Sequence, residues 1–261
     1  MPASALINVM TYAARKAGRS LARDFGEVER LQVSVKGPAN FVSVADCRAE
    51  DIIYTELVKA RPDYGFLMEE RGNVDGADKT HRWIVDPLDG TTNFLHGIPL
   101  FCISIGLERD SQLVAGVIYL PILDELYTAE KGKGAFLNDR RIRVSARRQL
   151  ADAVIATGIP HRGRPGHDCF HHELKVLSSE VSGIRRCGAA AVDLAWTASG
   201  RFDAYWERAI FPWDMAAGIV LVREAGGIVT DLTGSNEMLN KGTIVSGVPS
   251  IQKALLKKLK M

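Results

Sequence analysis

Apolar residues recur at intervals of three and four along several stretches of the chain, which is the spacing of an amphipathic helix. The first stretch covers residues 6–25, and its helix is predicted to end near Gly26, since glycine commonly follows the last turn of a helix. The same spacing predicts further helices between residues 46 and 61 and over 189–198, 212–225 and 251–259. The small residues of the helix over 189–198 predict close packing on a sheet.

Short runs rich in β-branched and aromatic residues predict strands between these helices. The predicted strands are 31–35, 64–68, 83–85, 101–108, 113–120, 126–130, 134–137, 142–145, 183–187, 202–207, 228–230 and 243–245. Short polar turns join the runs between residues 101 and 145, which predicts an antiparallel meander. The strand that begins at Trp83 is predicted to stop at Pro87, because proline fixes φ and favours a turn.

Two segments of the second half carry weaker patterns. A polar run over residues 147–152 precedes the apolar residues 154–156, which predicts a boundary between halves at 1–150 and 151–261. Residues 160–172 hold four of the six histidines together with prolines and glycines. Their spacing matches no zinc motif, so we expect a mobile polar loop there instead of a metal site.

Composition and charge narrow the class of partner. The chain has 261 residues, enough for a substantial core, and its 33 Lys and Arg against 31 Asp and Glu give a formal net charge of +2. This charge is too small for nucleic acid or a membrane to be the main partner, so a small molecule is expected. The four cysteines lack the spacing of a disulfide framework or zinc site, and no signal peptide or bilayer-spanning run is found. We therefore expect a soluble, cytoplasmic protein without membrane contact.

The densest candidate chemistry lies in residues 83–99, WIVDPLDGTTNFLHGIP. Pro87 and Gly90 predict a tight turn that places the carboxylates of Asp86 and Asp89 on one side. Two anions so close repel each other unless a hard cation such as Mg²⁺ lies between them. The residues of this stretch leave two interpretations open, an ordinary Asp-Gly surface turn and half of a metal site.

Other acidic residues have an ordinary structural explanation when each is taken alone. Glu69 and Glu70 follow a strand, where a solvated strand end explains them as well as a cleft does. Asp46 and Asp214 lie at the starts of predicted helices, where capping accounts for them. Glu207 near the end of a strand is compatible with a surface position. None of them indicates a site by itself.

The order of these features resembles that of the inositol monophosphatase family. Two long motifs carry the resemblance, WIVDPLDGTTNF at residues 83–94 and WDMAAGIVLVREAGG at 213–227, and it extends over nearly the whole chain. The bacterial members of the family are the most similar. The resemblance implies an α+β fold, a layered αβαβα sandwich of the inositol monophosphatase and fructose-1,6-bisphosphatase type with mixed, largely antiparallel sheets. It also implies a metal site where the two halves meet.

The resemblance assigns roles to individual residues. The implied metal ligands, for two or three Mg²⁺ ions, are Glu69, Asp86, the carbonyl of Leu88, Asp89 and Asp214. The implied catalytic residues are Asp46 and Thr91, which orient the attacking water, together with Glu69. The implied substrate-binding residues are Gly90, Thr91, Gly188, Ala189, Ala190, Glu207 and Asp214. Lys36 matches a lysine on the flap beside the metals.

The activity implied by the resemblance is hydrolysis of myo-inositol monophosphate to inositol and phosphate by metal-activated water. Inhibition by lithium and a homodimer are expected on the same basis. Related substrates stay open, namely a sugar bisphosphate, histidinol phosphate or a phosphoadenosine nucleotide. A different class also stays open, because some bacterial relatives serve the transcription machinery. Arginines at 140, 141, 143, 147, 148, 185 and 186 would be compatible with a polymerase or transcription-factor contact.

Overall fold

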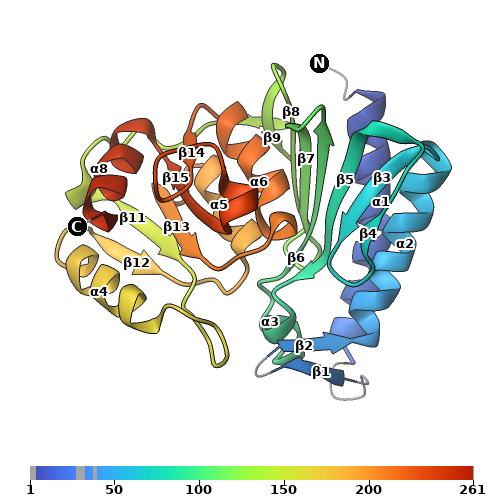
Figure 1. Ribbon diagram of the computed structural model, residues 1–261, viewed down its shortest axis with the longest axis horizontal. Coiled ribbons are helices and arrows are strands. Elements are labelled where there is room, and N and C mark those ends of the chain that lie inside the picture. The colour runs from blue at the N-terminus through green and yellow to red at the C-terminus, as the bar shows by residue number, and fades with distance from the viewer. Residues whose placement is uncertain (1–3, 28–32, 38–39, 261) are drawn as a thin grey trace.

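Helices and sheets alternate in layers along the long axis of the molecule (Figure 1). The computed structural model describes residues 4–27, 33–37 and 40–260, and only the backbone of residues 33–37 and 40–43. The helices are α1 Ala5–Phe25, α2 Val44–Ala60, α3 Thr91–Leu95, α4 His167–Ser178, α5 Ala190–Ala198, α6 Pro212–Glu224, α7 Met238–Lys241 and α8 Pro249–Leu259, with a 3₁₀ turn at Leu150–Asp152. The strands are β1 Val33–Gly37, β2 Asn40–Ser43, β3 Tyr64–Met68, β4 Gly72–Val74, β5 Asp78–Asp89, β6 Cys102–Arg109, β7 Gln112–Leu120, β8 Glu125–Glu130, β9 Gly134–Leu137, β10 Arg140–Ile142, β11 Val154–Thr157, β12 Gly183–Arg185, β13 Ala204–Arg208, β14 Ile228–Thr230 and β15 Thr243–Gly247.

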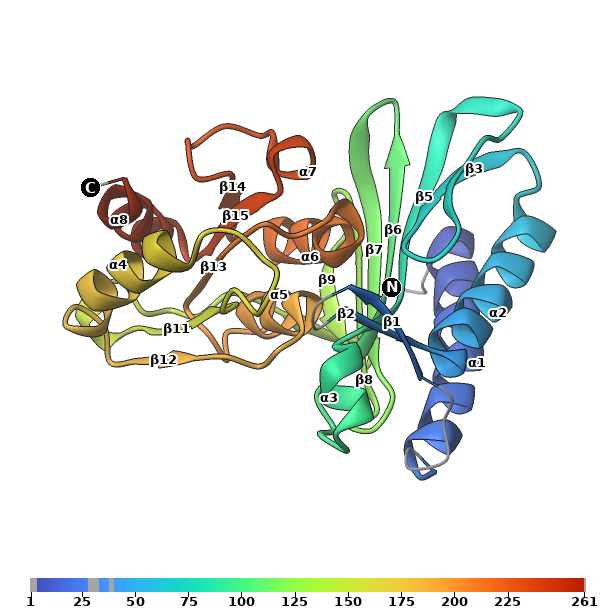
Figure 2. The ribbon, with the colours of Figure 1, turned by 60° about the horizontal axis from the view of Figure 1, so that its bottom comes forward.

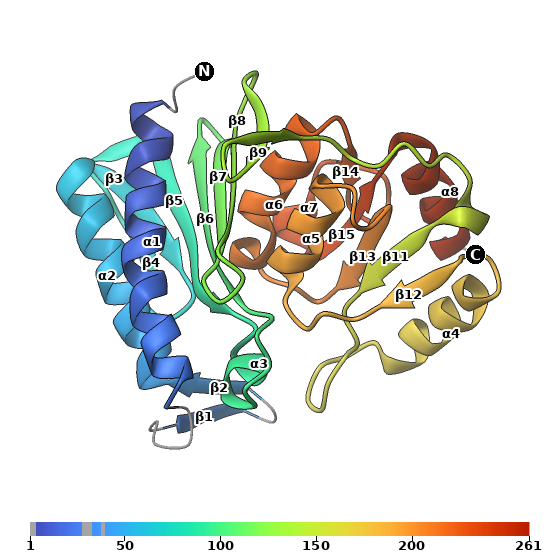
Figure 3. The same ribbon diagram turned by 180° about the vertical axis from the view of Figure 1, so that it is seen from behind.

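The first half of the chain builds an eight-stranded sheet in the order β10-β9-β8-β7-β6-β5-β3-β4. All neighbours in it are antiparallel except β3 and β5, which run parallel. The pairing confirms the predicted meander, although β10 begins two residues before the predicted run at 142–145 and shares only Ile142 with it. Helices α1 and α2 cover the outer face of this sheet, and α6 covers the inner face, as Figures 1 and 3 show from opposite sides.

The second half builds a five-stranded sheet in the order β12-β11-β13-β15-β14. Strand β11 is parallel to both of its neighbours, whereas β15 is antiparallel to β13 and β14. Helices α5 and α6 lie between the two sheets, and α4 and α8 lie on the far side of the smaller one (Figure 2). The predicted α+β fold with mixed, largely antiparallel sheets is therefore confirmed as an αβαβα sandwich.

The regularly spaced apolar residues of the helices form the cores between these layers. Helix α1 buries Met10, Ala17 and Leu21 completely against the large sheet, as its sequence pattern predicts. The strands β6 and β7 are covered on both faces, so they are apolar almost throughout and do not alternate. Each fully buried Leu or Ile stabilises the fold by about 2 kcal/mol. The cores thus fix the relative positions of the layers.

Glycines set the separation between α6 and the large sheet. Gly106 of β6 pairs with Gly116 of β7, and both face α6. A Cβ at Gly116 would lie 2.5 Å from the carbonyl oxygen of Ala217, and one at Gly106 would lie 2.8 Å from the Cβ of Ala216. Any larger residue would push the helix away from the sheet. The start of α6 therefore lies close to the strands.

Two sequence predictions are wrong in detail, and several short elements were not predicted. Strand β5 does not stop at Pro87 but continues to Asp89, because the pairing with β6 skips from Asp86–Ser104 to Asp89–Cys102 and accommodates the proline in a bulge. The segment 160–172 is not all loop, since α4 begins at His167. The short helices α3 and α7 and the strand β4 were not predicted as separate elements, because they have too few residues for a periodic pattern.

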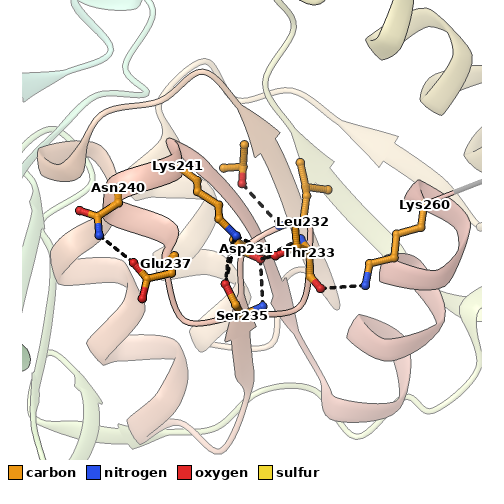
Figure 4. A network of polar contacts seen from close by, with 9 residues as sticks. Asp231, Leu232, Thr233, Ser235, Glu237, Asn240, Lys241 and Lys260 are labelled. Carbon is orange, nitrogen blue, oxygen red and sulfur yellow. Dashed lines mark hydrogen bonds and ion pairs between the residues drawn. The ribbon is translucent and has the colours of Figure 1, made fainter.

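A polar network closes the turn after β14 (Figure 4). The carboxylate of Asp231, which is inaccessible to solvent, accepts hydrogen bonds from the backbone N–H groups of Thr233 at 2.7 Å and Ser235 at 2.9 Å. It also forms an ion pair of 2.7 Å with Lys241. Burial raises the pKa of Asp231, but the hydrogen bonds from Lys241, Ser235 and Thr233 outweigh burial and hold the pKa well below its usual value. None of these residues lines the pocket described below.

In the part of the chain that the structure describes, no helix has both the length and the apolar character needed to cross a membrane.

Candidate active site

One pocket of about 170 Å³ lies between the two halves of the chain. Its walls come from the end of β5, the start of α3, the segment before α4, the start of α5, the end of β13 and the start of α6. The predicted site residues that line it are Glu69, Asp86, Leu88, Asp89, Gly90, Thr91, Gly188, Ala189, Ala190, Glu207 and Asp214. The structure therefore gathers residues that are up to 145 positions apart, from Glu69 to Asp214.

The bulge in β5 positions Asp86, Leu88 and Asp89. The buried carboxylate of Asp86 accepts a hydrogen bond of 2.9 Å from the backbone N–H of Leu88. Asp89 accepts one of 2.6 Å from the backbone N–H of Ala191 at the start of α5. This second bond joins the two halves of the chain directly at the pocket.

Ser104 of β6 holds the start of α6 beside Asp86. Its hydroxyl, which is fully buried, donates a hydrogen bond of 3.0 Å to the carbonyl of Trp213, and Ser104 is the strand partner of Asp86. The next residue, Asp214, accepts a hydrogen bond of 2.7 Å from the backbone N–H of Phe211. Asp214 therefore does cap its helix, as its place in the sequence predicted, and it also lines the pocket. The two roles are compatible because a carboxylate has two oxygens.

The acids of this pocket disfavour one another's charge. Burial raises the pKa of Asp86 well above its usual value, and the nearby charges of Glu69, Asp89 and Asp214 raise it further. Burial and the charge of Asp214 likewise raise the pKa of Asp89. Burial also raises the pKa of Asp214. Such a group of carboxylates is unfavourable unless protons or cations neutralise it.

The donor set of the pocket fits a hard divalent cation. Within the described parts of the chain, no three His, Cys, Asp or Glu side chains are already arranged to chelate a metal. Asp86, Asp89 and Asp214 each accept a hydrogen bond from a backbone N–H with one carboxylate oxygen. Carboxylate and carbonyl oxygens are nevertheless the ligands that Mg²⁺ takes while it retains several waters, so a complete protein cage is not needed. The residues therefore fit Mg²⁺ by their chemistry and their common pocket.

Asp46 does not line the pocket but lies directly behind Thr91. Asp46 is buried in the first turn of α2, and the Thr91 hydroxyl lies 3.2 Å from its Oδ1. The same hydroxyl lies 3.1 Å from the carbonyl oxygen of Leu88. A hydroxyl has one proton and can donate it to only one of these acceptors at a time. When Thr91 donates to Asp46, its lone pairs are free to accept a proton from a water in the pocket.

Glu207 lines the pocket from β13, whereas Gly90 lines it from the turn between β5 and α3. Burial raises its pKa to about 7, although the hydroxyl of Tyr205, which donates a hydrogen bond of 2.5 Å to it, opposes this effect. The charges of Arg186 and Arg164 also lower the pKa of Glu207, so both guanidinium groups lie near this acid. Glu207 is therefore not an isolated surface residue.

Sequence reasoning did not assign four residues that the structure places at or beside the pocket. Arg164, Arg186 and Asp193 line it, and Asn93 contacts its wall. Arg186 was counted only among surface arginines, and Arg164 only within the predicted loop. No motif marks these residues, because their neighbours in the pocket are distant in sequence. The side chain of Lys36, predicted to lie on a flap, is outside the described part of the structure.

Comparison with known proteins agrees with this fold and pocket. The model of the inositol monophosphatase family matches residues 3–260. The chain belongs to the inositol monophosphatase family. The resemblance noted in the sequence is thereby confirmed, and membership of this family of metal-dependent phosphatases makes the chain a phosphatase of the hydrolase class.

The relatives span nearly the full chain. An inositol-1-monophosphatase of Mesorhizobium japonicum is 63% identical, over 100% of this chain and 98% of the relative. The Nus factor SuhB of Escherichia coli is 40% identical, over 96% and 94% of the two chains. The crystal structure of the extragenic suppressor protein suhB from Bartonella henselae matches with a TM-score of 0.96 and 61% identity, covering 98% of this chain and 99% of that one.

Proposed function

We propose that this protein is a Mg²⁺-dependent phosphomonoesterase that hydrolyses myo-inositol monophosphate to inositol and phosphate. One observation carries the proposal. A single pocket brings the acids Glu69, Asp86, Asp89 and Asp214 together with Glu207. The acids provide a place for cations and phosphate, and Glu207 provides an acceptor for hydroxyl groups of the alcohol. Relatives named inositol-1-monophosphatase, at 54% to 63% identity, support the choice of substrate.

In this proposal the residues at the end of β5 hold the cations. Glu69, Asp86, Asp89, Asp214 and the carbonyl of Leu88 are the proposed ligands of two or three Mg²⁺ ions. When bound, Mg²⁺ would neutralise the phosphate charge, lower the pKa of the attacking water and stabilise the departing alkoxide. Burial, and then the charges of the neighbouring acids, raise the pKa values of Asp86 and Asp89, and a cation bound between the acids would relieve that repulsion, which supports this assignment.

The chain's own groups orient the phosphate and the nucleophile. The N–H groups of Gly90 and Thr91 lie where α3 begins, and the first turn of a helix leaves such groups without partners within the helix. They can donate to the phosphate oxygens. Thr91 is proposed to accept a proton from the attacking water and to pass a proton toward Asp46, with which it is in contact. Glu69 is proposed to assist on the side of the pocket facing β3.

The alcohol is proposed to lie between Glu207 and the residues 188–190. Glu207 keeps at least one oxygen that can accept a hydrogen bond from a substrate hydroxyl, since Tyr205 donates only to Oε2. Ala189 and Ala190 present small side chains, and a Cβ at Gly188 would collide with Arg186 and Asn93. The absence of bulk here leaves space for a polyol ring.

The decisive experiment is phosphate release from myo-inositol monophosphate by the purified protein during a titration with Mg²⁺. We expect activity that depends on Mg²⁺, disappears in EDTA, is inhibited by Li⁺ and is lost in Asp89→Asn. Full activity in EDTA or an unchanged rate in Asp89→Asn would refute the proposal. A parallel panel of a sugar bisphosphate, histidinol phosphate and a phosphoadenosine nucleotide identifies the preferred alcohol. If kcat/KM is higher for one of these compounds than for myo-inositol monophosphate, that compound is the preferred substrate.

A second function, contact with the transcription machinery, is favoured by one observation. Two relatives named Nus factor SuhB are 40% to 42% identical to this chain, and the match covers 94% of the length of each. The arginines at 140, 141 and 148 are exposed and could serve such a contact. The test is whether the tagged protein retrieves RNA polymerase or an elongation factor from a lysate of its own cells. Recovery of neither would remove this function.

Three other features remain proposals. A homodimer is proposed from the resemblance to the family, and a cytoplasmic location from cysteines that lack disulfide or zinc spacing. A division into halves at 1–150 and 151–261 is proposed from the sequence, with the large sheet in the first half and the small sheet in the second.

A further inference from the structure

Asn93 joins the two sides of the pocket through its side-chain amide. It lies in α3, directly after the turn that contains Gly90 and Thr91, and its side chain is buried, with 4% exposed. Its Nδ2 donates hydrogen bonds to the carbonyl of Leu100 at 2.6 Å and to the carbonyl of Cys187 at 2.8 Å. An amide nitrogen has two hydrogens, so both are used. Leu100 follows Asn93 by 7 residues, whereas Cys187 follows it by 94.

The bond to Cys187 fixes the wall at residues 188–190. Gly188 follows Cys187 directly and adopts φ +88°, and a Cβ built there would lie 3.0 Å from Nδ2 and 3.1 Å from Oδ1 of Asn93. The backbone of the wall is thus packed tightly against the amide. At its other end the wall is held by Asp89, which accepts the N–H of Ala191. Two side chains from the first half therefore position this segment of the second half.

We propose that Asn93 is a positioning residue that sets the alcohol side of the pocket at a fixed place relative to the phosphate side. The proposal rests on the proposed function, since it assumes that phosphate lies near Gly90 and that the alcohol contacts residues 188–190. Loss of the amide removes the donor from the carbonyl of Cys187 and from that of Leu100 beside Gly90, and a polar group left unpaired in a buried place is costly. The wall then moves, while the turn at Gly90 keeps its own backbone. Substrates that use the wall lose affinity, and substrates that do not use it are unaffected.

The variant Asn93→Leu tests the proposal, because leucine has about the same size and cannot donate. Gln252→Leu is the matched control. Gln252 is also a buried amide, and its Nε2 donates to Thr230 at 2.8 Å and to the carbonyl of Val245 at 3.4 Å, on the opposite side of the small sheet. Asn93→Asp is the second variant. Its carboxylate keeps the shape of the amide but faces two carbonyl oxygens without a proton to donate, and it serves if Asn93→Leu does not fold.

Steady-state kinetics with two substrates give the first readout. For myo-inositol monophosphate we expect KM in Asn93→Leu to rise about tenfold, equivalent to about 1.4 kcal/mol, with a smaller change in kcat. For p-nitrophenyl phosphate, whose aromatic alcohol has no hydroxyl groups to place against the wall, kcat/KM should stay within about twofold of the wild type. Equal losses of kcat/KM on both substrates in Asn93→Leu would overturn the proposal. So would a loss in Gln252→Leu that is confined to myo-inositol monophosphate.

Hydrogen exchange gives a readout that does not depend on catalysis. Backbone amides of residues 187–191 should exchange at least about tenfold faster in Asn93→Leu or Asn93→Asp than in the wild type, and at the wild-type rate in Gln252→Leu. Unchanged exchange in the Asn93 variants would overturn the inference even if activity fell. A wild-type protein that releases no phosphate from either substrate would instead refute the proposed function, and the exchange rates would still decide the role of Asn93.

Discussion

Glu50 offers the sharpest test of how the fold supports the proposed metal site. This residue lies on α2 with 1% of its surface exposed, and its Oε2 accepts a hydrogen bond of 2.8 Å from the backbone N–H of Glu70. Its Oε1 lies 3.5 Å from Nε of Arg71. One residue before Glu70, directly after β3, the N–H of Glu69 donates to the carbonyl of Val85 at 3.3 Å. Glu50 therefore fixes the backbone immediately after a proposed ligand.

The expected effects of Glu50→Ala follow from these contacts. The substitution removes a charged acceptor from a buried backbone N–H and one partner of an ion pair, which should lower the free energy of unfolding by about 3 kcal/mol. Residues that hold a ligand in place typically alter metal affinity about 10- to 100-fold when they are removed. We therefore expect a loss of at least about tenfold in Mg²⁺ affinity. Glu50→Gln keeps an acceptor for Glu70 and should retain most of the affinity.

Calorimetric titration of the purified variants with Mg²⁺ measures this effect apart from catalysis. Asp24→Ala is the matched control, because Asp24 is also a buried acid and accepts a hydrogen bond of 2.7 Å from Arg48 between α1 and α2. It should lower stability without changing Mg²⁺ affinity. Wild-type affinity in Glu50→Ala, or an equal loss in Asp24→Ala, would show that Glu50 only stabilises the fold.

Two further predictions concern pH and stability. In EDTA, Glu207→Gln should gain stability relative to the wild type as pH rises from 5 to 8, by about 2 kcal/mol. In the folded wild type the pKa of Glu207 is about 7, above the usual 4.5. The contribution of Glu207 to the stability of the wild type is therefore present below pH 4.5 and lost as pH rises through 7. Melting curves at each pH measure this, and a constant difference would contradict it. Asp231→Asn should lower stability at pH 7 by about 2 kcal/mol, because it weakens the charged hydrogen bonds with Lys241 (Figure 4). The pKa of Asp231 is lowered in the folded state, so its contribution is fully present above the usual pKa of 3.8 and is lost progressively as pH falls from there through the folded pKa. Chemical denaturation at pH 7 and pH 3 should therefore show a difference that has begun to shrink at pH 3. A difference that is unchanged or larger at pH 3 would contradict this account.

The sequence was sufficient to predict the layers of the fold, because the helices and most strands have strong periodic patterns. It was less reliable at residues whose conformation depends on a neighbouring strand. Pro87 by itself predicts the end of a strand, yet β6 continues to pair on both sides of it and β5 extends to Asp89. The local pattern contains no information about that pairing. The same limit applies to α4, whose first turn follows a segment rich in Gly and Pro.

Some residues of the candidate site could also be predicted from the sequence, and others could not. Asp86 and Asp89 are recognisable from their own motif, whereas the link between Asp46 and Thr91 joins residues 45 positions apart. Only the resemblance to the family connected these two residues. Asn93 and Glu50 were not assigned any role because each acts on the backbone of a distant segment, and a hydrogen bond to a backbone carbonyl or N–H requires no particular residue type in the partner. Such contacts leave no pattern in a single sequence.

The position of Asp214 shows how packing without any polar chemistry contributes to the proposed site. The helix that carries it crosses the large sheet above the paired glycines 106 and 116, where no side chain separates helix from strand. Ser104, two residues before the first of these glycines, holds the carbonyl of Trp213 and is the strand partner of Asp86. Close packing therefore sets the distance of α6 from the sheet, and one hydroxyl sets its position along the strand. Together they place two acids side by side that repel each other, a position that the cores of the fold must stabilise until a cation binds.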